Sequence, residues 1–382
     1  MKKTRFKRLV SNTARRMKTY DRWGLIDKMV EAKASRAVLE ENERLECAPP
    51  VIMDWPADVR KPRVGLVKSE FDKYAYWPKF ERFLINNEIP YEFYDVYKST
   101  FADDADRFDI IVWRTISPYY GQWEAKDKIE FMQDFLHKHT LPPREALWFY
   151  EDKVREQWLF EYYKLPCIKT FISHSREEVE AYIENAKYPF ISKDKTCSGS
   201  NGVIIVKDKH QARKMCRLIF TRGLKLHESY IRQKNYVLFQ ELVPNKGFDL
   251  RVIIIGNSYF GYYRYPQKGD FKASGSGIVV KKEIPVEVLR LAARVRDCLP
   301  KSYLLAVDFL QDTRDDKYYI IESSIFISVE TCEQLVIDNL PGRYVEQNGE
   351  FIFEPGRFWL QELMMQELMN DWILEMKRKN NV

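Results

Sequence analysis

Short apolar runs alternate with stretches of helical spacing through residues 62–150. Three of the runs are aromatic or β-branched and predict strands, at residues 64–67, 91–96 and 109–113. Two longer stretches carry apolar side chains every three or four positions and predict amphipathic helices, at residues 77–87 and 124–137. Because strands that alternate with helices favour a parallel sheet, we expect an α/β unit here.

A second mixture of helices and strands follows, from residue 151 to residue 322. Apolar spacing predicts helices at residues 151–164, 211–220 and 285–298. Apolar and aromatic runs predict strands at residues 167–172, 236–242, 248–255, 259–265, 304–310 and 318–322. Ser173 or Ser175 is expected to cap a further helix, since Glu178 follows Ser175 at the spacing of a capping box.

The last predicted element is a helix at residues 357–379 with an apolar stripe among polar residues. Such a stripe is typical of a core or docking surface. A helix that binds a partner or lies on a membrane is the alternative.

Residues 188–208 form the stretch around which the chain is organised, and they predict a strand, a loop of small residues and a second strand. The loop contains Ser198, Gly199 and Ser200, and Lys193 precedes it. Small residues let backbone N–H groups turn toward an anion, and a lysine can hold a phosphate as a point charge. The pattern therefore fits a phosphate-binding loop, although a plain hairpin with a polar tip has the same composition.

Composition and charge narrow the class of protein. No stretch approaches the ~20 apolar residues of a membrane span, and residues 1–18 lack the apolar segment of a secretory signal. The six cysteines form no CxxC pair and the five histidines no metal-binding pattern, which argues against a disulfide framework or a zinc site. These features predict a protein of the reducing cytoplasm.

The net charge of +6 has a local origin, because residues 1–18 hold eight basic side chains and no acidic one, which leaves −2 for the rest. Such an arm can contact an anionic membrane surface, an acidic polymer or nucleic acid, or can be a solvated leader helix. We expect no nucleic-acid partner, because only these residues suggest one.

Charged residues recur at the ends of the predicted elements in an order that suits Mg-ATP. Lys153 and Lys193 can neutralise phosphates, and Asp308 and Glu322 are hard oxygen ligands of the kind that Mg²⁺ prefers. The remaining candidates are the backbone of Gln240, Glu241, Leu242 and Val243 for an adenine edge, a carboxylate at Glu241 or Asp249 for the ribose, and Arg251 and Arg264 for a phosphate. Each could instead be structural: Asp249 and Arg251 could form a salt pair, and Asp308 could cap a turn.

Arg114 follows the predicted strand at residues 109–113. Ligands of α/β sheets bind beyond the carboxyl ends of strands, so Arg114 is a candidate for an anionic group of a substrate. A surface arginine paired with a helix acid is the alternative.

The order of these motifs resembles the ATP-grasp superfamily, in particular its RimK-like and glutathione-synthetase-like ligases. The resemblance implies that Lys153, Lys193, Ser198, Gly199 and Ser200 contact phosphates, and that Arg264 stabilises the transferred phosphoryl group together with Lys193. It also implies that Gln240–Val243 meet adenine, that Asp249 meets the ribose, and that Asp308, Glu322 and Ser324 bind magnesium. Lys272 and Ser274 would lie toward the substrate.

Two positions depart from the family pattern. Ser324 stands where the family has an asparagine that completes the metal shell, and Ser274 stands where an asparagine is often found. Neither change removes a charged group, so we expect an active enzyme with an altered metal site.

The resemblance implies an α/β protein with an ATP-grasp fold, an N-terminal pre-ATP-grasp domain and helical terminal extensions. We expect a basic arm and linker at residues 1–61, the pre-ATP-grasp domain at 62–150, and the small lobe at 151–235. The large lobe with the metal site is expected at 236–340 and the C-terminal amphipathic helix at 341–382.

The implied activity is ligation of a carboxylate to an amine, with ATP and Mg²⁺, through an acyl phosphate. The high aromatic content and the basic arm suggest a sugar acid or a peptide of a cell-surface polymer as the substrate, with the arm at the membrane surface. Two alternatives remain: a kinase that phosphorylates a hydroxyl, and a nucleotide-binding protein without turnover.

Overall fold

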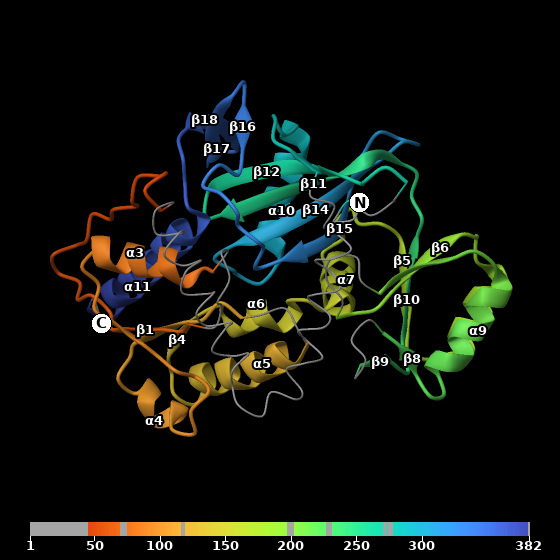
Figure 1. Cartoon of the computed structure of the whole chain (residues 1–382), viewed down its shortest axis with the longest axis horizontal. Coiled ribbons are helices and arrows are strands. Elements are labelled where there is room, and N and C mark those ends of the chain that lie inside the picture. The colour runs from red at the N-terminus through yellow and green to blue at the C-terminus, as the bar shows by residue number, and fades with distance from the viewer. Residues whose placement is uncertain are drawn as a thin grey trace, which may run out of the picture.

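The computed structural model describes residues 45–68, 75–115, 119–196, 202–226, 231–269, 273 and 278–380 (Figure 1). The basic residues 1–18 lie outside these ranges. The described residues form three sheets of four or more strands, one in each of three successive parts of the chain, and a short two-stranded sheet.

The first sheet is parallel and has the strand order β2-β1-β3-β4. Its strands are β1 (Val64–Leu66), β2 (Tyr91–Phe93), β3 (Ile110–Val112) and β4 (His139–Leu141). Four helices alternate with them: α3 (Trp77–Asn86), α4 (Phe101–Ala105), α5 (Tyr119–Asp134) and α6 (Arg144–Phe149). The predicted parallel α/β unit is therefore confirmed. The sequence analysis missed β4, α4 and α6, because such short elements show too few periods of apolar spacing.

The second sheet is antiparallel, with the order β5-β10-β6-β7. Its strands are β5 (Thr170–Ser173), β6 (Phe190–Lys193), β7 (Val203–Val206) and β10 (Val237–Glu241). Apolar residues of α8 (Arg176–Asn185) and α9 (Lys209–Ile219) form one cluster with Phe190, Val206 and Phe239 of the sheet. Ser175, one of the two expected caps, accepts a hydrogen bond from the backbone N–H of Glu178.

The small-lobe sheet extends further along the chain than expected. We expected this lobe to end at residue 235, but β10 lies between β5 and β6 and thus belongs to the same sheet. The helix α7 (Lys153–Tyr162) precedes the sheet, and the short strands β8 (Leu224–Lys225) and β9 (Arg232–Gln233) pair with each other.

The third sheet has eight strands, six of them in the order β15-β14-β11-β12-β17-β16. Its long central strands are β11 (Asn245–Ile255), β12 (Ser258–Tyr265), β14 (Leu305–Asp312) and β15 (Tyr318–Ser324). The remaining strands are β13 (Ile278–Val280), β16 (Val336–Ile337), β17 (Leu340–Gln347) and β18 (Glu350–Pro355). The helix α10 (Val286–Cys298) packs its apolar side chains into the same core.

Residues 341–355 correct the expectation that the segment from 341 onward belongs to the terminal helix. They form the β17–β18 hairpin, whose β17 pairs with β12. The turn between these strands lies at Asn348 and Gly349, which both have positive φ. This Asn-Gly pair is a hairpin signal that the sequence analysis did not use.

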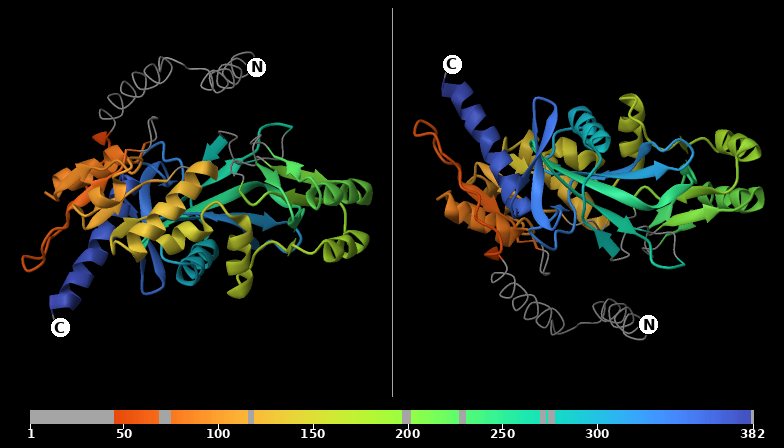
Figure 2. Two further views of the ribbon diagram at one scale, coloured as in Figure 1. Left: turned by 90° about the horizontal axis from the view of Figure 1, so that it is seen from below. Right: turned by 90° about the horizontal axis from the view of Figure 1, so that it is seen from above.

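The terminal helix α11 (Leu360–Asn380) is part of the core. Leu363, Leu368 and Trp372 are buried, and the carboxylate of Glu362 is fully buried against Arg82, with 2.9 Å between Oε1 and Nη1. Figure 2 shows α11 beside the N-terminal elements, at the opposite end of the molecule from the small lobe. Of its two interpretations, the core helix is the one observed.

Residues 45–61, expected as a linker, pack against α3 and α11. The backbone N–H of Val51 donates to Glu362, and Asn87 at the end of α3 donates to the carbonyl oxygen of Val51. Within the described residues, no helix is long and apolar enough to cross a membrane.

Candidate active site

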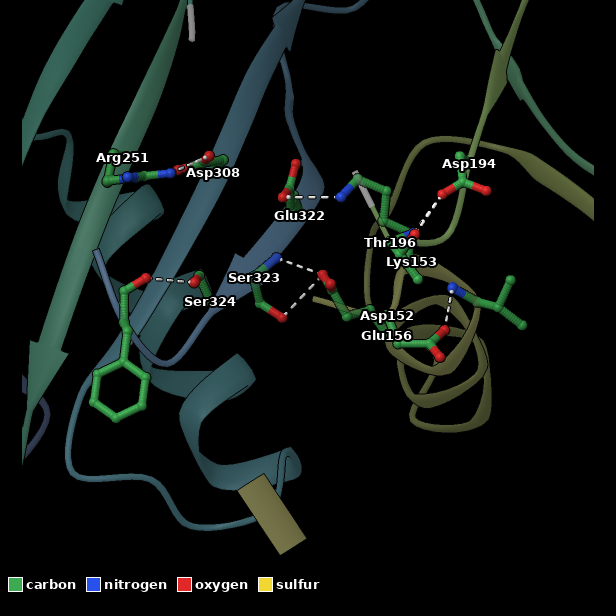
Figure 3. Close-up of polar contacts among 12 residues, drawn as sticks. Asp152, Lys153, Glu156, Asp194, Thr196, Arg251, Asp308, Glu322, Ser323 and Ser324 are labelled. Atoms are coloured by element: carbon green, nitrogen blue, oxygen red, sulfur yellow. Dashed lines mark hydrogen bonds and ion pairs between the residues drawn. The ribbon is translucent and has the colours of Figure 1, made fainter. Parts of the chain in front are cut away.

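Three neighbouring strands of the large sheet place three charged residues side by side. Arg251 on β11 lies opposite Asp308 on β14, and Asp308 lies opposite Glu322 on β15 (Figure 3). Opposite residues of antiparallel strands project from the same face of the sheet, so one row holds an arginine followed by two carboxylates. The three residues are far apart in the sequence, and the strand register alone brings them together.

Asp308 is the most densely paired member of this row. It accepts two bonds of 2.7 Å from Arg251 and one of 2.6 Å from Arg264, whose Nε also contacts Asp249 at 2.5 Å. Burial opposes ionisation of Asp308, but Arg251 and Arg264 outweigh it and hold the pKa of this carboxyl well below its usual range. Asp308 is therefore a buried carboxylate that stays charged at neutral pH.

Lys153 reaches this row from the first turn of α7. Its Nζ lies 3.2 Å from Oε1 of Glu322, and its backbone N–H donates to the carbonyl oxygen of Lys195. The helix begins here because Asp152 accepts hydrogen bonds from the N–H groups of Val154 and Arg155. An N-cap thus fixes a lysine between the small lobe and the large sheet.

Lys193, the last residue of β6, lies in the same electrostatic environment. Burial lowers the pKa of its ammonium group to about 8, with Lys153 adding to this effect and Glu322, Glu156 and Asp308 opposing it. Two lysines and two carboxylates from separate elements therefore converge, as the resemblance implied. Lys193 is only 7% exposed, so little water surrounds its ammonium group and little has to be displaced when an anion binds.

The lowered pKa of Lys193 predicts a pH-dependent affinity for ATP. The protonated lysine binds phosphate, so affinity should fall as the pH rises through about 8, where the ammonium loses its proton. Isothermal titration of Mg-ATP between pH 7 and 9.5 measures this effect. Lys193→Arg should remove the dependence, because a guanidinium keeps its charge over this range. An equal loss of affinity in both proteins would contradict this prediction.

Glu156 holds the strand that carries Glu322. Its Oε2 accepts hydrogen bonds from the backbone N–H of Ser323 at 2.7 Å and from the Ser323 hydroxyl at 3.2 Å (Figure 3). Its Oε1 is buried and has no hydrogen-bond partner within the described residues. Burial and the nearby Glu322 raise the pKa of Glu156, although Lys153 opposes this shift. Lys153 and Glu156 thus connect one face of α7 to two successive residues of β15.

Two substitutions of Glu156 should show whether its hydrogen bond to Ser323 or its charge stabilises the protein. Glu156→Ala should destabilise the protein by about 1–3 kcal/mol, because it leaves the N–H of Ser323 buried and unpaired. Glu156→Gln keeps an accepting oxygen and should cost less. Urea unfolding at pH 7 measures both, and Ser175→Ala at an exposed helix cap is a control that removes only exposed hydrogen bonds, to Glu178 and Glu177. Equal losses for the glutamine and alanine variants would contradict a positioning role.

Asp194 and Tyr236 anchor the start of the glycine-serine loop. The Asp194 carboxylate accepts hydrogen bonds from the backbone N–H and hydroxyl of Thr196, and from the hydroxyl of Tyr236 at 2.5 Å. The Tyr236 hydroxyl in turn accepts a hydrogen bond from the N–H of Lys195 at 3.2 Å. This network holds the chain immediately after Lys193. The loop residues Ser198, Gly199 and Ser200 themselves lie outside the described residues.

Glu151, which precedes α7, and Arg114, which follows β3 of the N-terminal sheet, interact electrostatically. Oε2 of Glu151 is buried without a hydrogen-bond partner in the described part of the chain, and its backbone has a φ of 52°. Burial raises the pKa of Glu151 to about 7; Lys153, Arg114 and Arg251 lower it, and Glu322 raises it. The guanidinium of Arg114 lies 5.4 Å from the ring of Tyr76 and 5.5 Å from the ring of Phe326.

Of the four residues expected near adenine, Gln240 and Glu241 end the strand β10, and Leu242 and Val243 follow it. Gln240 is buried and donates to Thr170, and Glu241 pairs with Arg314 at 2.6 Å. The N–H of Glu241 already donates to the carbonyl oxygen of Lys169. The backbone donors left at this strand end for a base are therefore those of Leu242 and Val243.

Four further expected residues either have other side-chain or backbone partners or lie outside the described residues. Asp249 contacts Arg264, its cross-strand partner, so its carboxylate is engaged with an arginine. The Ser324 hydroxyl donates to the carbonyl oxygen of Phe326 at 2.7 Å. Lys272 and Ser274 are outside the described residues.

The donor set fits magnesium in part. Asp308 and Glu322 supply hard oxygen ligands from one face of neighbouring strands. Asp308 is bonded to two arginines, and no cluster of three or more His, Cys, Asp or Glu side chains able to hold a metal occurs in the described ranges. The protein thus offers two carboxylates, and phosphate oxygens would have to complete the coordination.

The sequence analysis missed Glu151, Glu156, Asp194 and Tyr236 as members of this site. Glu151 adjoins the Asp152-Lys153 motif, and Asp194 directly follows Lys193. An acidic residue next to a motif lysine was therefore a sequence signal that could have identified Glu151 and Asp194 as members of the site. Nothing in the sequence connects Glu156 with Ser323, because their contact depends on how α7 docks against β15.

Three solved structures resemble the chain at low sequence identity. Carboxyaminoimidazole ribonucleotide synthase from Aspergillus clavatus, complexed with ATP, is 11% identical, has a TM-score of 0.50, and the match covers 75% of this chain and 81% of that one. A RimK domain ATP-grasp protein from Sphaerobacter thermophilus is 16% identical with a TM-score of 0.49, covering 69% and 91%. D-alanine–D-alanine ligase from Bacillus anthracis is 16% identical with a TM-score of 0.49, covering 70% and 87%.

At these identities the likeness concerns the fold alone, and the match to the Aspergillus enzyme supports it. No curated protein matches the chain in sequence. The family model of the RimK-like ATP-grasp domain matches residues 150–343, half of the 382 residues. This segment contains Lys153, Lys193, Arg264, Asp308 and Glu322. The chain therefore belongs to the RimK-like ATP-grasp family.

Proposed function

We propose that the protein is an ATP-grasp ligase that joins a carboxylate to an amine and forms ADP and phosphate. One observation carries the proposal: Lys153, Lys193, Asp308 and Glu322 come from four separate elements, and Glu322 pairs with Lys153 while lying opposite Asp308. One helix and two sheets supply these four residues, so their proximity in the sequence does not explain the cluster. A magnesium-bound triphosphate is a ligand with the charge to match it.

Each cation has a defined task in this proposal. Lys153 and Lys193 neutralise phosphate oxygens, and burial strengthens their attraction because little water screens it. Arg251 binds Asp308 through Nε and Nη2, and Arg264 binds it through Nη2 alone. Each arginine therefore has further N–H donors for a phosphoryl group. Charge that spreads over the transferred group is thus met by donors that are already oriented.

Asp308 and Glu322 would hold magnesium, which neutralises phosphate charge when bound. Leu242 and Val243 offer backbone donors to the adenine edge at the end of β10.

Arg114 binds the carboxylate substrate in this proposal. It follows β3 of the parallel sheet and lowers the pKa of Glu151, as Lys153 and Arg251 also do. The substrate carboxylate attacks the γ-phosphorus, and the resulting acyl phosphate is attacked by the amine. The high aromatic content of the chain supports a sugar acid or a peptide of a cell-surface polymer as the substrate class that we propose.

Hydroxylamine trapping tests the proposed reaction. The protein is incubated with Mg-ATP, hydroxylamine and a panel of uronic acids, amino acids and acidic peptides. A ligase forms a hydroxamate together with ADP, because hydroxylamine captures an acyl phosphate. A kinase forms ADP and a phosphate ester but no hydroxamate. That result would contradict the ligase proposal and favour a kinase.

A nucleotide-binding protein without turnover is the second candidate, favoured by the Ser324 hydroxyl, which donates to Phe326. Tight binding of Mg-ATP without ADP formation across the whole panel would favour it. Ser324→Asn then provides a direct check, since the amide restores the family residue at this position. A gain of turnover in this variant would show that the serine limits activity.

A further inference from the structure

Two cysteines that are 285 positions apart meet at the surface of the large lobe. The Sγ atoms of Cys47 and Cys332 lie 2.6 Å apart, and both residues carry free thiols. Cys47 belongs to the segment that packs beside α3 and α11, whereas Cys332 lies between β15 and β16. The pairing is a property of the tertiary structure, because the spacing of the six cysteines gives no indication of it.

The contact lies between two firmly held segments. On one side, the carbonyl oxygen of Leu45 accepts a hydrogen bond from the indole of Trp359, and that of Ala48 accepts one from Arg82 at 2.7 Å. On the other side, the carbonyl oxygen of Cys332 accepts a hydrogen bond from the N–H of Phe358 at 2.9 Å. These bonds hold the two backbones on either side of the sulfur atoms.

The two thiols differ in access to solvent. Cys47 is exposed, whereas Cys332 is 3% exposed. Burial and the adjacent Cys47 raise the pKa of Cys332 to about 12. An oxidant in solution would therefore react first with Cys47, and Cys332 would resolve the product. The guanidinium of Arg357 lies within electrostatic range of both sulfur atoms, although Glu333 pairs with it at 2.7 Å.

We propose that Cys47 and Cys332 form a reversible disulfide in the presence of a disulfide oxidant such as oxidised glutathione. The thiolate of Cys47 attacks one sulfur of glutathione disulfide, which forms a mixed disulfide and releases one glutathione thiolate. The thiolate of Cys332 then attacks the sulfur of Cys47 and releases the second glutathione. The protein loses two protons and two electrons, and one glutathione disulfide becomes two thiols.

The bridge would connect the chain entering the N-terminal domain to the segment that follows the carboxylate strand β15. That segment includes Phe326, which packs beside Arg114, and Ile327, whose carbonyl oxygen accepts a hydrogen bond from Tyr76. A disulfide between residues 285 positions apart lowers the conformational entropy of the unfolded chain. The oxidised protein should therefore be more stable than the reduced protein. Cys47→Ser should abolish the difference between the two redox states.

Thiol counting and peptide mapping test the proposal on the full chain. The protein is fully reduced, desalted, exposed to oxidised glutathione, quenched with acid and alkylated under denaturing conditions. We expect two of the six thiols to disappear, a non-reduced peptide that joins Cys47 to Cys332, and a melting temperature several degrees above that of the reduced form. Dithiothreitol should restore all six thiols.

Two variants make the result unambiguous. Cys47→Ser replaces an exposed residue, so it should fold as the reduced wild type and form no bridged peptide. Cys216→Ser, in the small lobe, should still form the bridge. Retention of all six thiols would overturn the proposal, as would a glutathione adduct that persists on Cys47 or a bridge between other cysteines.

Discussion

Asp308→Asn is expected to destabilise the protein by about 3–5 kcal/mol. The substitution removes the negative charge that Arg251 and Arg264 share, and it turns an amide N–H₂ toward two guanidinium groups. Arg251 and Arg264 are both largely buried, so water cannot replace the lost partner. Removing one member of a buried ion network costs far more than the network contributes in total, since the remaining charges stay in a medium of low polarity.

Urea unfolding followed by circular dichroism measures this loss. The matched control is Glu92→Gln, which breaks the exposed pair between Glu92 and Arg107 at 2.6 Å and should cost less than about 1 kcal/mol. Saturating Mg-ATP should stabilise Asp308→Asn less than wild type, because the variant lacks one of the two proposed magnesium ligands. A loss for Asp308→Asn no larger than that for the control would show that the arginine network is not a stabilising feature.

Lys153→Met is expected to weaken the binding of Mg-ATP by about 10- to 100-fold, because a charge-assisted contact to phosphate contributes about 1.5–3 kcal/mol. The methionine keeps the length and apolar stem of the lysine but removes its charge. Stability should change much less than in Asp308→Asn, since Glu322 is about a third exposed and can be hydrated when Lys153 is lost. Hydroxamate formation should fall by about 10²-fold or more.

Isothermal titration with Mg-ATP and melting curves separate these effects. Lys187→Ala, an exposed lysine of the same lobe, is the control and should bind as wild type does. Lys153→Arg should recover part of the affinity, because charge is retained while the geometry changes. If Lys153→Met binds Mg-ATP as tightly as wild type, Lys153 does not contact the nucleotide. The proposed function would then lose one of its two phosphate-binding lysines.

The main elements of the fold could be predicted because each has a periodic apolar pattern of its own. The helix α10 and the strands β11, β12 and β14 are long enough to show that period clearly. Short elements such as β4 gave weaker signals and were missed, whereas the β17–β18 hairpin was missed because its Asn-Gly turn was not used. The assignment of β10 to the small-lobe sheet was also beyond reach, because pairing with β5 and β6 depends on contacts far along the chain.

The sequence by itself determined the family, the order of the lysines and carboxylates, and the alternation of strands and helices. These properties depend on residue type and local spacing. Only the tertiary structure decided which groups meet: the Arg251–Asp308–Arg264 network, Glu156 beneath Ser323, and Cys47 against Cys332. Such pairings follow from strand register and helix docking, which burial of the whole core sets, and no local pattern of residues encodes them.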